Sequence, residues 1–223
     1  MKLARVGNKG WLTLIGGGEF SFGETLVADK EWVEKLGPGS IGFLPTASGS
    51  TDYGVHFSEY MAETFDREVR TIPVYRPRDA RRAKNLERLE ESAAIYIGGG
   101  VSDHLIETLE DSPALETIAR FLGSGGSVIA IAAAAQALGT LARGVAGHRE
   151  LSGFGWLPNG VVEANFDPGH DRRLRQMMEN SMVQWGLGLP AGSAVLMGPS
   201  DQYEFVGKSF LLGDADGDYK VYG

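Results

Sequence analysis

The segment Trp11-Leu-Thr-Leu-Ile-Gly-Gly-Gly-Glu19 joins a short apolar run to a glycine turn, and Ile95-Tyr-Ile-Gly-Gly-Gly100 repeats this form. Apolar runs of this length, nearly continuous rather than alternating, are typical of strands that are covered on both faces. Five such runs occur in the first 131 residues: Trp11–Ile15, Ile41–Leu44, Val69–Val74, Ala93–Ile97 and Val128–Ile131. The sequence therefore predicts a parallel sheet that contains these five strands.

Residues with helical spacing fill the intervals between these runs. Leu115, Ile118 and Leu122 share one helical face, and Ser112-Pro113 before them is typical of an N-cap followed by a first-turn proline. Strands that alternate with helices indicate an α/β protein, here a three-layer α/β/α sandwich with a mostly parallel central sheet. Because no linker, internal repeat or low-complexity tract interrupts the chain, we expect residues 1–223 to form one domain.

The second half of the chain has a different pattern. Asp167-Pro168 predicts the start of another helix, and the apolar face of that helix would carry Leu174, Met177, Met178, Met182 and Trp185. Short strands are predicted at Ala194–Met197, Tyr203–Val206, Phe210–Leu212 and Tyr219–Tyr222. The acidic segment Asp214–Asp218 has its glycine in the fourth position, whereas a calcium loop needs it in the sixth, so we expect a hairpin turn there.

Composition excludes several classes of function. The chain contains no cysteine, which removes disulfides, thiolate metal sites and cysteine nucleophiles. A net charge of −8 disfavours binding to nucleic acid or to anionic membranes. The run Trp11–Ile15 is too short for a signal peptide or a membrane span. We expect a cytoplasmic protein with no nucleic-acid or membrane partner and with no cofactor or metal, and a homodimer is left open.

Four arginines follow the third predicted strand, at positions 76, 78, 81 and 82. A solvated surface is the simplest interpretation of this cluster, and an acidic ligand or partner is the alternative.

The candidate binding residues lie where the predicted strands end. The carboxyl ends of parallel strands meet at one edge of a sheet, where ligands of such folds bind. Glycine in these turns lets backbone N–H groups approach a ligand, and the helices that follow favour anions. The candidate residues from these turns are Gly17, Gly18, Glu19, Thr46, Ser48, Gly98, Gly99 and Gly100.

The order Gly16-Gly-Gly-Glu19, Pro45-Thr-Ala-Ser48 and Ile95-Tyr-Ile-Gly-Gly-Gly100, followed by a strand and a small-residue turn, resembles the dipeptidase E and cyanophycinase family of serine peptidases. The resemblance extends from Leu12 to about Leu212. It implies a class I glutamine amidotransferase-like, flavodoxin-like fold and cleavage of peptide bonds next to aspartate. It also implies a Gly-x-Ser-Ala-Gly-Ala nucleophile elbow after the fifth strand.

The residues at the matching positions cannot perform that chemistry. The elbow motif falls on Ala130–Ala135, so that Ala132 stands in place of the nucleophile, and the family's His-Phe pair falls on Asn165-Phe166. Alanine has no nucleophilic atom, and asparagine cannot accept a proton as histidine does. No catalytic residue is therefore assigned, and the resemblance makes Ala132, Ala133 and Asn165 candidate ligand-binding residues.

Three hypotheses remain open. The first is an inactive homologue whose pocket binds a small anionic molecule or a peptide end, with the Gly99 and Ala133 N–H groups as donors to the anion. The second is a hydrolase of small acidic peptides or amides with another nucleophile, Ser48 or Ser102, and with His104 or His170 as base. The third is a structural or interaction protein with a vestigial pocket.

Overall fold

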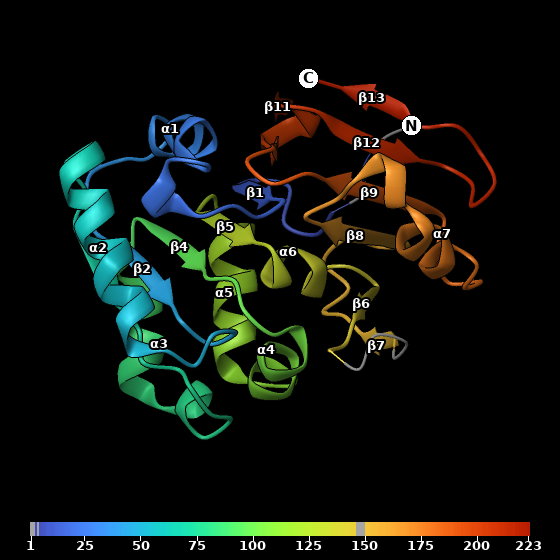
Figure 1. The fold of residues 1–223 in the computed structure, drawn as a ribbon. Coiled ribbons are helices and arrows are strands. Elements are labelled where there is room, and N and C mark those ends of the chain that lie inside the picture. Colours follow the sequence, from blue (N-terminus) through green and yellow to red (C-terminus); the bar gives the residue numbers. More distant parts are fainter. Residues whose placement is uncertain (1–2, 4, 146–149) are drawn as a thin grey trace.

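The computed structural model describes residues 3, 5–145 and 150–223, and its largest element is a seven-stranded sheet of order β11-β10-β1-β5-β4-β2-β3 (Figure 1). Five adjacent strands are parallel: β1 (Trp11–Ile15), β5 (Ser127–Ile131), β4 (Ala94–Ile97), β2 (Ile41–Leu44) and β3 (Val69–Thr71). The prediction of one parallel sheet is confirmed. At the other edge, β10 (Ala194–Met197) is antiparallel to β1 and β11 (Tyr203–Val206) is antiparallel to β10.

One of the predicted strands is shorter in the structure. β3 ends at Thr71, whereas the apolar pattern extends to Val74. Ile72 and Val74 are fully buried. Ile72 N–H still donates to the Phe43 carbonyl of β2 at 2.8 Å, and past that bond the apolar pattern marks burial in the core.

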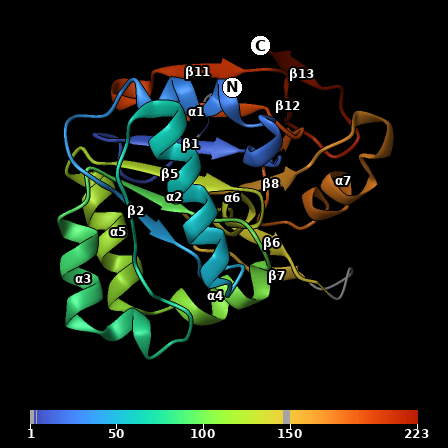
Figure 2. The ribbon, with the colours of Figure 1, turned by 60° about the vertical axis from the view of Figure 1, so that its left-hand side comes forward.

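Helices cover both faces of this sheet (Figure 2). One face packs against α1 (Leu26–Val33) and α2 (Thr51–Phe65), and the other against α3 (Ala83–Glu90), α4 (Ser102–Leu109) and α5 (Pro113–Gly123). Consecutive residues of a strand point to opposite faces, so Phe43 and Leu44 belong to different clusters of the core. The Ser112 hydroxyl accepts a hydrogen bond from Leu115 N–H, which confirms the predicted cap of α5. The fold is therefore the expected α/β/α sandwich.

A smaller, four-stranded sheet of order β13-β12-β9-β8 follows in the chain. Its strands are β8 (Gly160–Ala164), β9 (Trp185–Leu189), β12 (Ser209–Leu212) and β13 (Lys220–Tyr222), and α7 (Arg172–Met178) packs against β8 and β9. The short helix α6 (Ala133–Ala137) and the hairpin of β6 (Leu141–Arg143) and β7 (Glu150–Ser152) connect the two sheets. Four 3₁₀ turns complete the described elements: Phe20–Phe22, Asp79–Arg81, Pro168–His170 and Pro199–Asp201.

The predicted helix after Pro168 was wrong in its extent. It ends at Met178, Met182 is 53% exposed, and Trp185 opens strand β9. Gly160 explains the change, because the Trp185 ring lies where a Gly160 side chain would be, and the indole N–H donates to the Pro158 carbonyl. A tertiary contact therefore overrides the helical spacing of the apolar residues.

The acidic segment near the C-terminus forms the predicted turn between β12 and β13. Gly217 N–H donates to the Asp214 carbonyl at 3.1 Å, and Asp216 N–H donates to the Asp214 carboxylate at 3.2 Å. In the part of the chain that the structure describes, no group of three His, Cys, Asp or Glu residues could hold a metal ion. Over the same residues, no helix is long and apolar enough to cross a membrane.

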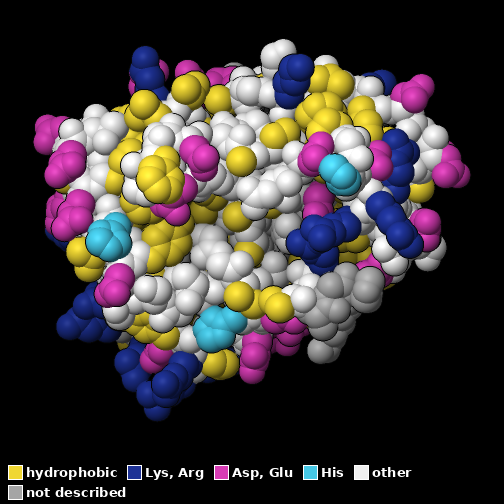
Figure 3. Space-filling model, in the orientation of Figure 1, with side chains coloured by type: hydrophobic (Ala, Val, Ile, Leu, Met, Phe, Trp, Pro, Cys, Tyr) yellow, Lys and Arg dark blue, Asp and Glu magenta, His cyan; other side chains and the backbone are white. Residues whose placement is uncertain are grey.

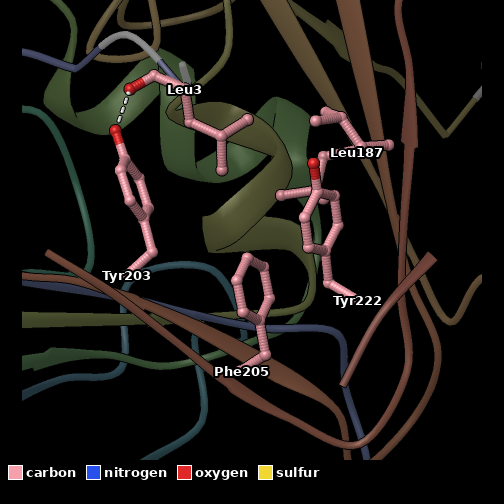
Figure 4. Close-up of a pocket in the computed structure, with 6 residues that line it drawn as sticks. Leu3, Leu187, Tyr203, Phe205 and Tyr222 are labelled. Atoms are coloured by element: carbon pink, nitrogen blue, oxygen red, sulfur yellow. Dashed lines mark hydrogen bonds between the residues drawn. The ribbon is translucent and has the colours of Figure 1, made fainter. Parts of the chain in front are cut away.

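An apolar pocket of about 110 Å³ lies where the edge of the large sheet meets the smaller sheet (Figure 4). The Tyr203 hydroxyl donates to the Leu3 carbonyl at 2.7 Å, and the rings of Phe205 and Tyr222 stack with centroids 4.8 Å apart. Its described lining contains no charged side chain. This pocket lies between the N-terminal segment and the two sheets, and its described lining offers no positive charge to an anion.

Candidate functional site

The turn between β5 and α6 has a backbone conformation that alanine rarely adopts. Ala132 lies at φ 53° and ψ −115°, and its N–H donates to the Ile15 carbonyl at 2.9 Å. A residue other than glycine in such a region costs about 1–3 kcal/mol, and strain of this kind collects at functional sites. The strand-to-helix turn that would present a serine is therefore present and carries a methyl group instead.

Two residues near Ala132 carry methyl groups that the core accommodates. Ala130 and Ala134 stand where the motif has glycine, and both are fully buried in the core cluster beneath the sheet. The Ala133 N–H has no protein acceptor among the described residues. It therefore remains a donor at the start of α6.

The turn after β4 faces the elbow. A Cβ atom placed on Gly99 would lie 3.4 Å from the Ala132 Cβ, and one placed on Gly98 would lie 3.0 Å from the ring of Tyr53, from α2. Burial raises the pKa of Tyr53 to about 12, against the lowering effect of the Gly99 backbone, so the hydroxyl stays neutral. Of the two predicted donors, Gly99 therefore lies in a turn that is packed beside Tyr53, and Ala133 lies at the start of α6.

Asn165 lies beside the first glycine turn, directly after β8. Its φ is 50°, which asparagine tolerates better than most residues, and its N–H donates to the Gly16 carbonyl at 2.7 Å. Gly17, at φ 135°, makes room for the Asn165 amide, since a Cβ on Gly17 would overlap it. The structure therefore brings the β1 turn and the residue at the histidine position together.

A polar cavity of about 220 Å³ opens at this edge. Its lining includes Gly100, Ala132, Ala133 and Asn165 among the predicted residues. It also includes Ser102, which the sequence offered as an alternative nucleophile, and three polar side chains that the sequence did not single out for the site: Gln136, Arg143 and Arg173. In Figure 3, dark-blue side chains lie right of the centre of this face. Arg143 and Arg173 lie in elements whose position relative to the elbow could not be predicted from the sequence. Arg173 nevertheless belongs to an arginine-rich segment that the sequence shows plainly.

The buried carboxylate of Glu163 lies next to Arg143, which lines the cavity. Glu163 Oε1 lies 3.5 Å from the Arg143 guanidinium, and Oε2 has no hydrogen-bond partner among the described residues. Burial raises the pKa of Glu163, and the charges of Arg143 and Arg173 act against that rise. Arg173 forms no ion pair within the described residues, so the cavity keeps a net positive charge.

Several predicted residues serve the turns and do not line this cavity. The Thr46 hydroxyl donates to the Val74 carbonyl at 2.8 Å, and the Ser48 hydroxyl donates to the Pro45 carbonyl at 3.0 Å. Glu19 is exposed and accepts from the Ser21 hydroxyl, and Gly18 packs beside Thr25. Gly98 packs against Phe43 and Tyr53.

No base reaches the elbow from the described lining. His104 Nε2 lies 3.0 Å from the Tyr75 carbonyl in a different cavity, and the His170 side chain is 86% exposed beside Asp167. The hydrogen bond from His170 lowers the pKa of Asp167. Ser102 is the one hydroxyl side chain in the described lining, and its Oγ lies 3.5 Å from the Ala133 carbonyl. The geometry therefore suits binding of an anion better than nucleophilic attack.

Comparisons with known proteins agree with this architecture. The model of Peptidase family S51 matches residues 12–201. A peptidase from an acI-B1 Actinobacterium has 22% identity and a TM-score of 0.75, with 97% of this chain and 96% of that chain covered. A candidate peptidase E protein from Listeria monocytogenes EGD-e has 15% identity and a TM-score of 0.63, with 88% and 98% covered. A search of curated proteins found no match.

Proposed function

The chain belongs to peptidase family S51, and from this premise we propose that it is a catalytically inactive member that binds a small carboxylate ligand or a peptide end at the elbow. The observation that carries the proposal is Ala132, which holds the strained backbone of a nucleophile elbow without a nucleophilic atom. The site therefore keeps the shape of a catalytic turn while its side-chain chemistry is absent.

The size of the expected loss in turnover supports the proposal. Removal of a triad serine or histidine costs on the order of 10⁶ in turnover, and binding and oxyanion contacts leave only about 10³–10⁴ over water. Here the serine position holds Ala132 and the histidine position holds Asn165. The described lining of the cavity contains no histidine, aspartate or glutamate that could take over the role of the base. Useful hydrolysis is therefore not expected.

The cavity instead offers donors to an anion. Arg143 and Arg173 supply positive charge, and Gln136, Ser102 and the Ala133 N–H supply hydrogen bonds. No aspartate or glutamate belongs to the described lining. Guanidinium groups bind carboxylates with two parallel hydrogen bonds, which favours a ligand with a free carboxylate. The size of the cavity suits a group such as an aspartyl side chain or a peptide terminus.

Two measurements on the purified protein test the proposal. Turnover on a panel of Asp-X dipeptides should be absent, and N-acetyl-aspartate should bind, as followed by isothermal titration calorimetry. Arg173→Gln should weaken binding about tenfold, as expected for loss of one charge-assisted hydrogen bond. Arg172→Gln is the matched control, since it neutralises the exposed neighbour of Arg173, which does not line the cavity.

Other outcomes would separate the alternatives. Hydrolysis that Ser102→Ala abolishes would establish the divergent hydrolase and contradict the proposal. Absence of both hydrolysis and carboxylate binding would favour a structural protein with a vestigial pocket.

A further inference from the structure

A second cavity lies beyond the end of β3, around the arginine-rich loop of residues 75–82. The loop has four arginines in a chain whose net charge is −8. In Figure 3, dark-blue side chains gather at the lower left of the face, over this loop. This local basic cluster contrasts with the acidic charge of the whole chain.

Buried polar groups hold this loop in place. Asp79 is 6% exposed, and its carboxylate accepts from the N–H groups of Tyr75 and Arg76 at 3.3 and 3.2 Å. The buried Asn85 amide donates to the carbonyls of Pro73 and Asp79 at 3.2 and 3.0 Å. Burying such groups is unfavourable unless every hydrogen bond is made, so the loop is fixed before any ligand arrives.

Two further side chains attach the same loop to the sheet and to α4. The buried Thr46 hydroxyl donates to the Val74 carbonyl, and His104 contacts the Tyr75 carbonyl. These contacts position the exposed arginines on the outer side of the loop. This is the arrangement expected of a preorganised binding site.

The cavity beside the loop encloses about 580 Å³, within the usual range for small-molecule sites. Arg76, Arg78 and Arg82 line it together with Tyr75 and His104. Asp79 lies 3.3 Å from Arg82 and 3.9 Å from Arg78, so its buried carboxylate is shared by two guanidinium groups. Arg76 has no ion-pair partner among the described residues. The cavity therefore carries an excess of positive charge.

Helix α2 adds to this field. It has 15 residues and begins at Thr51, which lines the cavity, so the partial positive charge of its N-terminus acts there and is reduced in part by Asp52 in the same turn. The cavity is distinct from the one at the elbow. In the first turn of α4, Ser102 lines the elbow cavity and His104 lines this one.

We propose that this second cavity binds the phosphate group of a phosphorylated small molecule. A phosphate monoester carries a charge of up to about −2 and three terminal oxygens, which matches several guanidinium groups better than a single carboxylate does. The volume left beyond the phosphate, bordered by Tyr75 and Pro73, accommodates the organic part. The proposal is independent of the function assigned to the elbow.

Isothermal titration calorimetry at low ionic strength tests this site with three probes: inorganic phosphate, glycerol 3-phosphate and succinate. The titrations are made in the wild type and in the Arg173→Gln variant, in which carboxylate binding at the elbow is weakened, and the comparison of succinate with the ester is taken from the variant. Both phosphates should bind, the ester more tightly, and succinate at least tenfold more weakly than the ester. Arg76→Gln should weaken binding of the ester about tenfold, because it removes a charge-assisted contact. Arg82→Gln is a second variant, with thermal unfolding measured for both because Arg82 also pairs with Asp79.

The matched control is Arg81→Gln, from the same basic run. Arg81 donates to the Asp111 carbonyl and does not line the cavity, so its substitution should leave binding unchanged. Arg173→Gln should also leave it unchanged, since that variant reports on the elbow. The proposal is overturned if neither phosphate binds at millimolar concentration, if succinate binds as well as the ester, if the ester gains nothing over phosphate, or if Arg81→Gln weakens binding as much as Arg76→Gln.

Discussion

The elbow cavity and the arginine-loop cavity lie on either side of the first turn of α4 and differ in what forms them. At the elbow, the decisive features belong to the backbone: the positive φ of Ala132 and the open N–H of Ala133. At the loop, they belong to side chains, with Arg76 and Arg82 exposed and Asp79 buried behind them. Backbone geometry survives the loss of side-chain chemistry, whereas a side-chain site exists only while its residues are present.

The two regions also differ in how their conformations are maintained. The elbow keeps a strained residue within a well-packed core, where Ala130 and Ala134 are fully buried. The loop is unstrained and is held by satisfied buried hydrogen bonds from Asp79 and Asn85. Four variants with effects of decreasing size test the two regions.

Restoring the chemistry at the elbow should give the largest effect. Ala132→Ser together with Asn165→His should raise hydrolysis of Asp-X dipeptides at least about 10²-fold over either single variant, because a positioned base contributes about 10²–10⁴-fold. Initial rates on the dipeptide panel provide the measurement. Each single variant should stay at the wild-type level, since one lacks a base and the other a nucleophile. If Ala132→Ser alone equals the double variant, Asn165 is not at the position of the missing base.

Loosening the arginine loop should give the next largest effect, this time on stability. Asn85→Ala should lower the free energy of unfolding by about 1–3 kcal/mol, because it leaves the carbonyls of Pro73 and Asp79 without donors. Urea denaturation measures it. Asn180→Ala is the control, since its amide bonds Glu150 and the Met182 N–H at the exposed surface, where water can replace both partners, and its loss should change little. An equal effect of the two variants would refute the idea that buried hydrogen bonds hold the loop.

Relieving the elbow should give a smaller effect of opposite sign. Ala132→Gly should raise the free energy of unfolding by about 1 kcal/mol, because glycine removes about 1–3 kcal/mol of strain and adds about 0.5–1 kcal/mol of entropic cost. The control is Ala134→Gly, inside α6, which should destabilise by about 1 kcal/mol. A destabilised Ala132→Gly variant would show that the elbow is not strained.

The smallest effect concerns the pH dependence of stability. Burial raises the pKa of Glu163 above its ordinary value of 4.5, so the folded protein holds this proton more tightly than the unfolded chain. The contribution to stability is present below about pH 4.5 and is lost as the pH rises through the raised pKa. Glu163→Gln should therefore gain stability relative to the wild type as the pH rises from 4.5 to neutrality. Thermal unfolding across this range measures the difference, with Glu87→Gln on exposed α3 as control. A difference that is flat with pH would contradict a raised pKa.

Much of the fold could be predicted because it depends on local patterns. Continuous apolar runs such as Ile41–Leu44 and Ala94–Ile97 are buried on both faces. Their burial can therefore be predicted from the run of apolar residues itself. The same logic failed after Pro168, where helical spacing extended to Trp185 but the ring packs over Gly160 and the residue begins a strand. A local pattern cannot show which distant segment will cover an apolar residue.

For the candidate site, too, the sequence predicted one part and the tertiary structure decided the other. The sequence by itself predicted, through the resemblance of its motif order to the family, that the positions of the nucleophile and the base hold Ala132 and Asn165. The tertiary structure alone decided that Arg143 and Arg173 line the same cavity, and that Tyr53 packs beside the glycine turn after β4. It also decided the positive φ of Ala132, since an alanine run by itself favours a helix. The physical reason is that cavity lining and backbone strain depend on which separate segments meet at the sheet edge, and packing of the whole chain sets that meeting.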